Sequence, residues 1–199
     1  MTETDLVRGH ARVVRASVAV VSQLRSDDLD RPTPCGNWRL ADLLAHMTVQ
    51  HDGFAAAAAG NGGDPALWAV HPLGDDPVAS YTAAAERVVS AFAQPGVLER
   101  EFALPEISPI TTFSGTLAIG FHFIDYVVHG WDVARAVDVP FSLDADLEEI
   151  ALRIAMSVPD GPGRAQPDGA FGPGKPVVDA APVLDRIVAH LGRSPTWSG

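Results

Sequence analysis

The segment 116–137 restricts how this chain can fold more than any other part of the sequence. It is apolar on nearly every side, yet ionisable side chains cross it at spacings of three, four and three residues: His122, Asp125, His129 and Asp132. An α-helix turns by about 100° per residue, so it would gather these groups within an arc of roughly 80°. A carboxylate buried among apolar neighbours must be neutralised, hydrogen-bonded or bound to a cation. The segment is therefore predicted to be a largely buried helix with one polar stripe.

Asp125 and His129 form the strongest functional signal in this stripe. They lie one helical turn apart, which is a spacing at which a carboxylate and an imidazole can hold one metal ion. The same spacing also suits a buried hydrogen-bonded pair without a metal. His46 is the expected third ligand, because the apolar residues of segment 43–47 predict that it faces the core. A lone histidine on such a face is more often an ordinary core residue.

Two imidazoles and one carboxylate leave a coordination position open, which is typical of catalytic rather than structural zinc sites. Zinc is therefore the expected ion, and nickel, iron or manganese would suit the same donors. Candidates for the hydrogen-bond partners that orient a ligating imidazole are Asp132, His122 and Gln50. The residues thus predict an open divalent-metal site made by His46, Asp125 and His129.

Hydrophobic periodicity predicts that most of the remaining chain is also helical. Besides 116–137, helices are expected at 5–25, 38–59, 78–93, 144–158 and 181–191. Asn37 is the expected N-cap of the second helix, and Gly192 is the residue expected to end the last one. Segment 97–112 is predicted to be an extended connection, and the Gly- and Pro-rich segment 160–176 a surface loop. The predicted fold class is all-α, a helical bundle in a single domain spanning 1–199.

Charge and cysteine content narrow the function classes. The formal net charge is −11, so most of the surface would repel a phosphate backbone, and nucleic acid is not an expected partner. The apolar helix carries too many ionisable groups for a membrane span, and the N-terminus lacks the features of a signal peptide. The single cysteine, Cys35, fits a reducing cytoplasm, and it is either a nucleophile or, more commonly, a small packing residue. We expect a cytoplasmic protein that acts on a small molecule.

Two motifs resemble those of a known family. Residues 33–38 read TPCGNW and are followed by Asp42, Leu43 and His46, and residues 125–136 read DYVVHGWDVARA. Together they resemble the DinB-like metalloenzymes, most closely an actinobacterial branch that is similar to the metal-binding domain of mycothiol-dependent maleylpyruvate isomerase. Residues 191–197, LGRSPTW, resemble the tails of the same branch, so the likeness covers nearly the whole chain.

The resemblance implies a DinB-like four-helix bundle, here with additional short C-terminal helices, and a divalent metal at the positions of His46, Asp125 and His129. The isomerase pattern has glutamate where this chain has Asp125, which is shorter by one methylene group. Other members of the superfamily use three histidines, so His122, one turn from Asp125, is a candidate substitute ligand. The isomerase also has a C-terminal domain for which 199 residues are too few, so its particular substrate is not carried over.

Three functional hypotheses follow. In the first, a low-molecular-weight thiol, mycothiol by resemblance, binds the open metal position, loses its proton and attacks a small electrophile, as in a transferase or isomerase. Arg135 or Arg164 would orient an anionic substrate, and in a hydrolytic variant Asp132 or His122 would act as the base. In the second, the same ligands serve a non-catalytic metal- or small-ligand-binding stress protein. In the third, the polar stripe is a subunit interface of a homodimer.

Overall fold

The computed structural model describes residues 3–166, 170–178 and 180–199, and these residues are mostly helical. The α-helices are α1 (Glu3–Val21), α2 (Leu40–Ala58), α3 (Pro77–Phe92), α4 (Gly115–Ala136), α5 (Ala145–Ser157) and α6 (Val183–His190). The shorter elements are η1 (Ser26–Asp28), η2 (Pro65–Trp68), η3 (Val97–Glu99), η4 (Pro162–Ala165), β1 (Glu101–Ala103) and β2 (Thr112–Ser114). The two strands pair antiparallel, with Phe102 opposite Phe113. The prediction of an all-α fold is confirmed.

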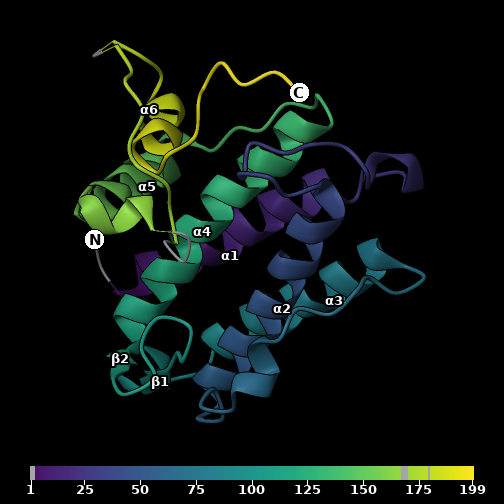
Figure 1. The fold of residues 1–199 in the computed structure, drawn as a ribbon. Coiled ribbons are helices and arrows are strands. Elements are labelled where there is room, and N and C mark those ends of the chain that lie inside the picture. The colour runs from purple at the N-terminus through teal and green to yellow at the C-terminus, as the bar shows by residue number, and fades with distance from the viewer. Residues whose placement is uncertain (1–2, 167–169, 179) are drawn as a thin grey trace.

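Helices α1 to α4 form a four-helix bundle (Figure 1). α1 packs against α3 and α4, and α2 also packs against α3 and α4, so the four helices enclose a common interior. α5 and α6 pack against each other and lie on the other side of α4 from α2 and α3. These are the additional C-terminal helices expected from the sequence, and they cover the outside of the bundle.

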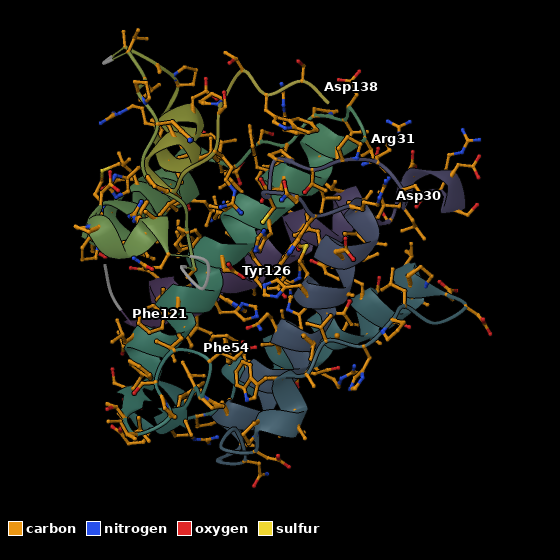
Figure 2. The ribbon with its side chains drawn as sticks, viewed as in Figure 1. Asp30, Arg31, Phe54, Phe121, Tyr126 and Asp138 are labelled. Carbon is orange, nitrogen blue, oxygen red and sulfur yellow. The ribbon has the colours of Figure 1, made fainter. Side chains whose placement is uncertain are left out.

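The bundle interior is filled by large apolar side chains. The fully buried aromatic residues include Tyr81, Phe92, Phe102, Phe123 and Tyr126, all within one core cluster. Phe54 of α2 and Tyr126 of α4 both contact the His122 ring inside the bundle, whereas Asp30, Arg31 and Asp138 lie toward one outer end (Figure 2). Burying a side chain of this size stabilises the fold by about 1.5–3 kcal/mol. The core therefore fixes how α2 and α4 lie relative to each other.

The loop before α2 differs from the sequence prediction. Arg39, and not Asn37, precedes the first residue of α2, and the Asp42 carboxylate accepts a hydrogen bond from the Arg39 backbone N–H at 3.0 Å. The backbone N–H of Leu40 donates to the Arg31 carbonyl at 2.9 Å, which closes the loop on itself. Because this closure delays the start of the helix, the prediction of Asn37 as the N-cap is wrong.

The remaining connections are more ordered than the sequence indicates. Segment 97–112, predicted to be extended, begins with η3 and contains β1. Segment 160–176 is a loop as predicted but contains η4, and its residues 167–169 lie outside the described residues. Gly192 follows α6 with φ +86°, the left-handed conformation predicted for a glycine that ends a helix. Within the described parts of the chain, we find no helix with the length and hydropathy needed to cross a membrane.

A chain of three histidines crosses the interior, with one ring from each of α1, α4 and α2. His10 Nε2 lies 2.8 Å from His122 Nδ1, and His122 Nε2 lies 3.2 Å from His51 Nδ1. All three side chains are buried, and Tyr126 stacks on both His51 and His122. Burial lowers the pKa of His10 to about 3 and holds the pKa values of His51 and His122 well below the ordinary value of 6.5. The rings are therefore neutral at pH 7, and each contact is one N–H donated to a bare ring nitrogen.

Candidate metal centre

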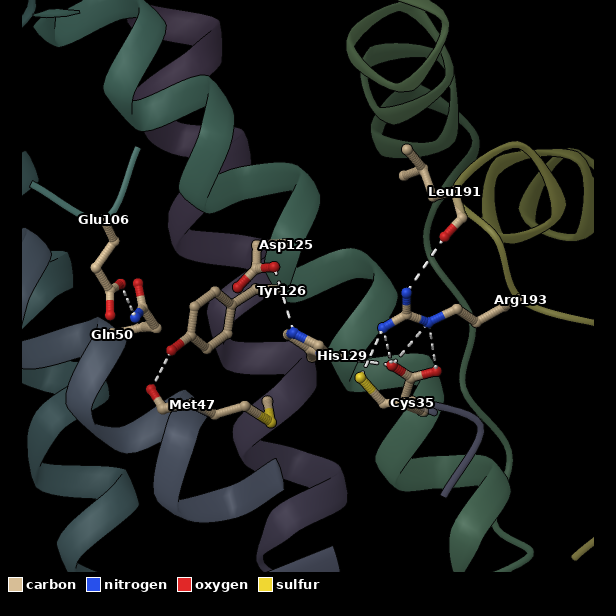
Figure 3. Close-up of polar contacts among 10 residues, drawn as sticks. Cys35, Met47, Gln50, Glu106, Asp125, Tyr126, His129, Leu191 and Arg193 are labelled. Carbon is tan, nitrogen blue, oxygen red and sulfur yellow. Dashed lines mark hydrogen bonds and ion pairs between the residues drawn. The ribbon is translucent and has the colours of Figure 1, made fainter. Parts of the chain in front are cut away.

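The structure brings the three predicted ligands together. His46 comes from α2, Asp125 and His129 come from successive turns of α4, and one donor atom of each lies within 4.8 Å of the other two. Asp125 Oδ1 is 3.3 Å from His129 Nε2, as Figure 3 shows. The ring centroids of His46 and His129 are 5.4 Å apart. Small side-chain adjustments would bring such donors to the ligand distances of about 2.0–2.2 Å that a zinc ion requires.

A hydrogen bond joins α4 and α2 next to the candidate ligands. Tyr126, next to Asp125 in α4, donates its hydroxyl proton to the backbone carbonyl of Met47, next to His46 in α2 (Figure 3). Burial raises the pKa of Tyr126 well above its ordinary value of 10, so the hydroxyl remains a donor at every physiological pH. The two helices are therefore joined directly beside the candidate ligands.

One side of the ligand set is buried and the other is open. The His129 side chain is 5% exposed, whereas the Asp125 side chain is 25% exposed and His46 is partly exposed. Trp38, from the loop before α2, is exposed to solvent, and its ring centroid lies 4.9 Å from that of His46. The Trp38 ring is also nearly parallel to the His129 ring, at 6.5 Å. An exposed aromatic ring therefore lies beside both candidate histidine ligands.

The second nitrogen of His129 is held by a buried carboxylate. His129 Nδ1 lies 3.0 Å from Asp132 Oδ2, and Asp132 is fully buried. Histidines that bind metals usually donate their other N–H to such an acceptor, which fixes the tautomer and leaves the remaining nitrogen free for the ion. The structure confirms the expected contact of Asp132 with a candidate ligand.

His46 is ready to bind a cation without losing a proton. Burial, and to a smaller extent the neighbouring His129, lower the pKa of His46 to about 4, while Asp125 acts in the opposite direction. The His46 ring is therefore neutral above about pH 5, and its lone pair needs no deprotonation step at pH 7.

A second set of donors, Cys35, His129 and Asp132, also converges. Arg193 already lies among them, because its Nη2 is 3.0 Å from Asp132 Oδ2 and 3.1 Å from Cys35 Sγ (Figure 3). A metal ion there would have to displace a guanidinium, so the set containing His46 is the better candidate. Burial raises the pKa of Cys35 to about 12, although the Arg193 charge opposes this shift. The thiol is protonated at pH 7, which favours the packing role over the nucleophilic one.

The side chains of the polar stripe on α4 belong to two separate clusters. His122 contacts His10 and His51 in the interior, so the structure does not place it among the ligands. Gln50 donates to Glu106 at 2.6 Å and not to a ligating ring (Figure 3). Most of the stripe is buried by the chain's own helices, which does not support its use as a subunit interface.

The two arginines expected to orient a substrate have other contacts. Arg164 is buried and donates to the backbone carbonyls of Val158, Pro159 and His190. Arg135 donates to the carbonyl of Trp197. The sequence did not predict that Arg193 and Trp38 lie close to the candidate metal centre. Both lie within motifs that carried the family resemblance, but nothing in a linear sequence indicates that Trp38 lies beside His129 or that Arg193 contacts Asp132.

Comparison with known proteins identifies the family. Residues 10–134, which include all three candidate ligands, match the mycothiol maleylpyruvate isomerase N-terminal domain. The chain belongs to this family. This agrees with the DinB-like resemblance of the TPCGNW and DYVVHGWDVARA motifs.

Other members of known sequence and structure extend the likeness beyond residue 134. The uncharacterized proteins Rv0738 of Mycobacterium tuberculosis strain H37Rv and MT0763 of strain CDC 1551 are each 30% identical over 197 residues, 96% of this chain and 98% of theirs. The crystal structure of a histidine-to-alanine mutant of the mycothiol-dependent maleylpyruvate isomerase gives a TM-score of 0.62 at 13% identity, over 88% of this chain and 74% of that one. A second crystal structure of the isomerase gives a TM-score of 0.55 at 11% identity, over 78% of this chain and 68% of that one. These structures share the fold.

Proposed function

We propose that this protein holds a divalent metal ion, with zinc as the expected ion, between His46, Asp125 and His129. We further propose that it activates a low-molecular-weight thiol of the mycothiol type for attack on a small electrophile. The observation that carries the proposal is the convergence of these donors from two helices, with a buried carboxylate on the second nitrogen of His129. Membership of the mycothiol maleylpyruvate isomerase N-terminal domain family supports the choice of thiol.

The residues of the site suit this chemistry. A divalent metal would supply positive charge beside a coordinated thiol and so lower the pKa of its S–H toward neutrality. His46 offers a neutral lone pair at pH 7, and Asp125 offsets part of the charge of the ion. Trp38 covers one side of the ligands and would limit the access of water to the sulfur. The three protein donors leave room for the thiol in the remaining position.

The reaction class follows from the thiol. After the S–H proton has passed to solvent, the sulfur would form a bond to an electrophilic carbon while a C=C π bond, an epoxide C–O bond or a carbon–halogen bond at that carbon breaks. A transferase would leave the new C–S bond in place. An isomerase would break it again, restoring the double bond after rotation about the single bond. Maleylpyruvate, the compound named for the structural neighbours, is the first electrophile to test. A set of small epoxides, alkyl halides and unsaturated acids would cover the transferase alternative.

We expect mycothiol to bind at the metal of the cobalt-substituted protein. Sulfur ligation should add a thiolate-to-cobalt charge-transfer band in the near ultraviolet, which buffer or an oxygen analogue of the thiol does not produce. At least one electrophile of the set should then consume thiol more than about 100-fold faster than without protein. Absorption spectroscopy and a thiol assay on the same sample measure both effects.

Two variants and two outcomes complete this test. His46→Ala should lose the band and the rate, while His71→Ala, which removes an exposed histidine, should keep both. A band without transfer to any electrophile would favour the non-catalytic metal- or ligand-binding role. If mycothiol leaves the cobalt spectrum unchanged, the proposed thiol chemistry is wrong.

A further inference from the structure

Arg193 is a buried arginine whose contacts point into the protein. Its side chain is 6% exposed, and its Nε lies 3.3 Å from both carboxylate oxygens of Asp132. Its Nη2 contacts Asp132 Oδ2 at 3.0 Å and Cys35 Sγ at 3.1 Å, and its Nη1 donates to the Leu191 carbonyl at 3.2 Å. These contacts engage all three guanidinium nitrogens, so Arg193 acts through the groups that it contacts, which are Asp132, Cys35 and the Leu191 carbonyl.

Asp132 connects Arg193 to the candidate metal centre. Its Oδ2 lies 3.0 Å from His129 Nδ1 and 3.0 Å from Arg193 Nη2, and the whole side chain is buried. A guanidinium can only donate hydrogen bonds, so both carboxylate oxygens of Asp132 are acceptors toward Arg193. The Oδ2 that accepts from Arg193 also accepts from His129, which places the N–H of His129 on Nδ1. The Nε2 lone pair is then left on the side of Asp125.

The turn after α6 delivers Arg193 to this position. Gly192 has φ +86°, and a Cβ on Gly192 would lie 2.7 Å from the backbone of Gly172, so a larger residue does not fit there. The backbone N–H of Arg193 donates to the Val188 carbonyl at 2.8 Å. The direction of the Arg193 side chain is therefore set by the backbone that ends α6.

We propose that Arg193 is a positioning residue of the metal centre, which pairs with Asp132 and thereby fixes the tautomer of His129 that metal binding requires. The proposal rests on the proposed function for the use of that tautomer, but the tautomer itself is a property of the metal-free protein. Arg193 lies outside residues 10–134, the part that matches the family domain. The segment after α6 thus takes part in building a centre whose ligands all lie within that domain.

The test compares Arg193→Ala with the matched control Arg164→Ala. Arg164 is also buried and also fixes the C-terminal region, through carbonyls that include that of His190, but among the described residues it makes no hydrogen bond or ion pair with Asp132. In the metal-free protein at pH 9, ¹⁵N NMR of the His129 ring should show the proton on Nδ1 in the wild type and in Arg164→Ala. In Arg193→Ala it should show a mixture of tautomers.

Metal affinity is the second readout on the same variants. Loss of a partner behind a metal-binding histidine typically reduces metal affinity 10–100-fold, so Arg193→Ala should weaken zinc binding by about that factor. Arg164→Ala should lower the melting temperature while leaving zinc affinity unchanged. Equal losses of zinc affinity in both variants would show that Arg193 acts only through general stability and would overturn the proposal.

A more conservative variant covers the case in which Arg193→Ala does not fold. Arg193→Lys keeps the positive charge but loses the forked contact with Asp132, so it should show a partial tautomer mixture and a several-fold loss of zinc affinity. Wild-type values for both would contradict the proposal. If the wild type itself binds no zinc, the proposed function fails, but the tautomer measurement still decides the role of Arg193.

Discussion

Acidification from pH 7 to pH 5 should remove about 6 kcal/mol from the free energy of unfolding of the metal-free protein. This is the loss expected when three buried histidines stay neutral in the folded state but are protonated in the unfolded state. The three are His10, His51 and His122, whose pKa values all lie well below 6.5 because of burial. Since a domain of this kind is stable by about 5–15 kcal/mol, such a loss would unfold a large fraction of the molecules.

The sign of the effect follows from the direction of the pKa shifts. Each folded-state pKa is lowered, so the stabilising contribution of each ring is fully present above the unfolded pKa of about 6.5. As the pH falls below 6.5, the unfolded state takes up protons first, and the loss continues toward the folded pKa, which for His10 is about 3. His46, with a folded pKa of about 4, adds to the loss in the same direction. Carboxylates contribute little above pH 5, because their unfolded pKa values are near 4.

Urea titrations at half-unit pH steps, with a chelator present, measure this dependence. His10→Leu removes one of the three buried rings, so the loss between pH 7 and pH 5 should shrink by about 2 kcal/mol. His71→Ala removes an exposed histidine and should leave the loss unchanged. A free energy of unfolding that stays constant between pH 7 and pH 5 would show that the histidine chain is not buried as described.

His46→Ala or His129→Ala should weaken zinc binding by more than about 100-fold. Loss of even a hydrogen-bond partner of a metal-binding histidine reduces metal affinity about 10–100-fold, and each of these variants removes a proposed ligand itself. The two histidines come from different helices, so equal effects would show that both helices contribute to one centre. Competition titrations against a chromophoric zinc chelator cover the required range of affinities.

Two further variants separate a direct ligand from a nearby polar group. His122→Ala removes a histidine of the same α4 stripe that lies in the interior chain, so zinc affinity should stay near that of the wild type if the variant is folded. Asp125→Asn keeps the size of the side chain but removes its charge, and it should lose affinity as the histidine variants do. A large loss in His122→Ala combined with none in Asp125→Asn would reverse the assignment of the ligands.

The sequence predicts the fold well because its strongest signals are local. Apolar periodicity located every α-helix in the described residues to within a few residues, and the glycine at 192 ended α6 as expected. The start of α2 was misplaced because the hydrogen bond from Leu40 to the Arg31 carbonyl is formed between residues of a folded loop. Such a contact has no signature in hydrophobic periodicity.

The candidate site could be predicted most directly where its residues share one helix. Asp125, His129 and Asp132 follow helical spacing on α4, so the sequence alone predicts that their side chains lie close together. The apolar surroundings of His46 predicted that it faces the core, but not which helix it meets. Arg193 reaches Asp132 through a turn at the far end of the chain, which no local pattern indicates. The spacing rule also placed His122 on the same stripe, and the family resemblance made it a substitute ligand, because an arc on a helix does not show which neighbouring helix covers it.

The most direct test of the account is a zinc-soaked crystal measured at wavelengths on both sides of the zinc absorption edge. The account predicts one anomalous peak within about 2.0–2.2 Å of a His46 ring nitrogen, His129 Nε2 and an Asp125 oxygen, and no peak among Cys35, Asp132 and Arg193. A peak at the second set, or none at either set at full soaking concentration, would contradict the metal centre proposed for this protein.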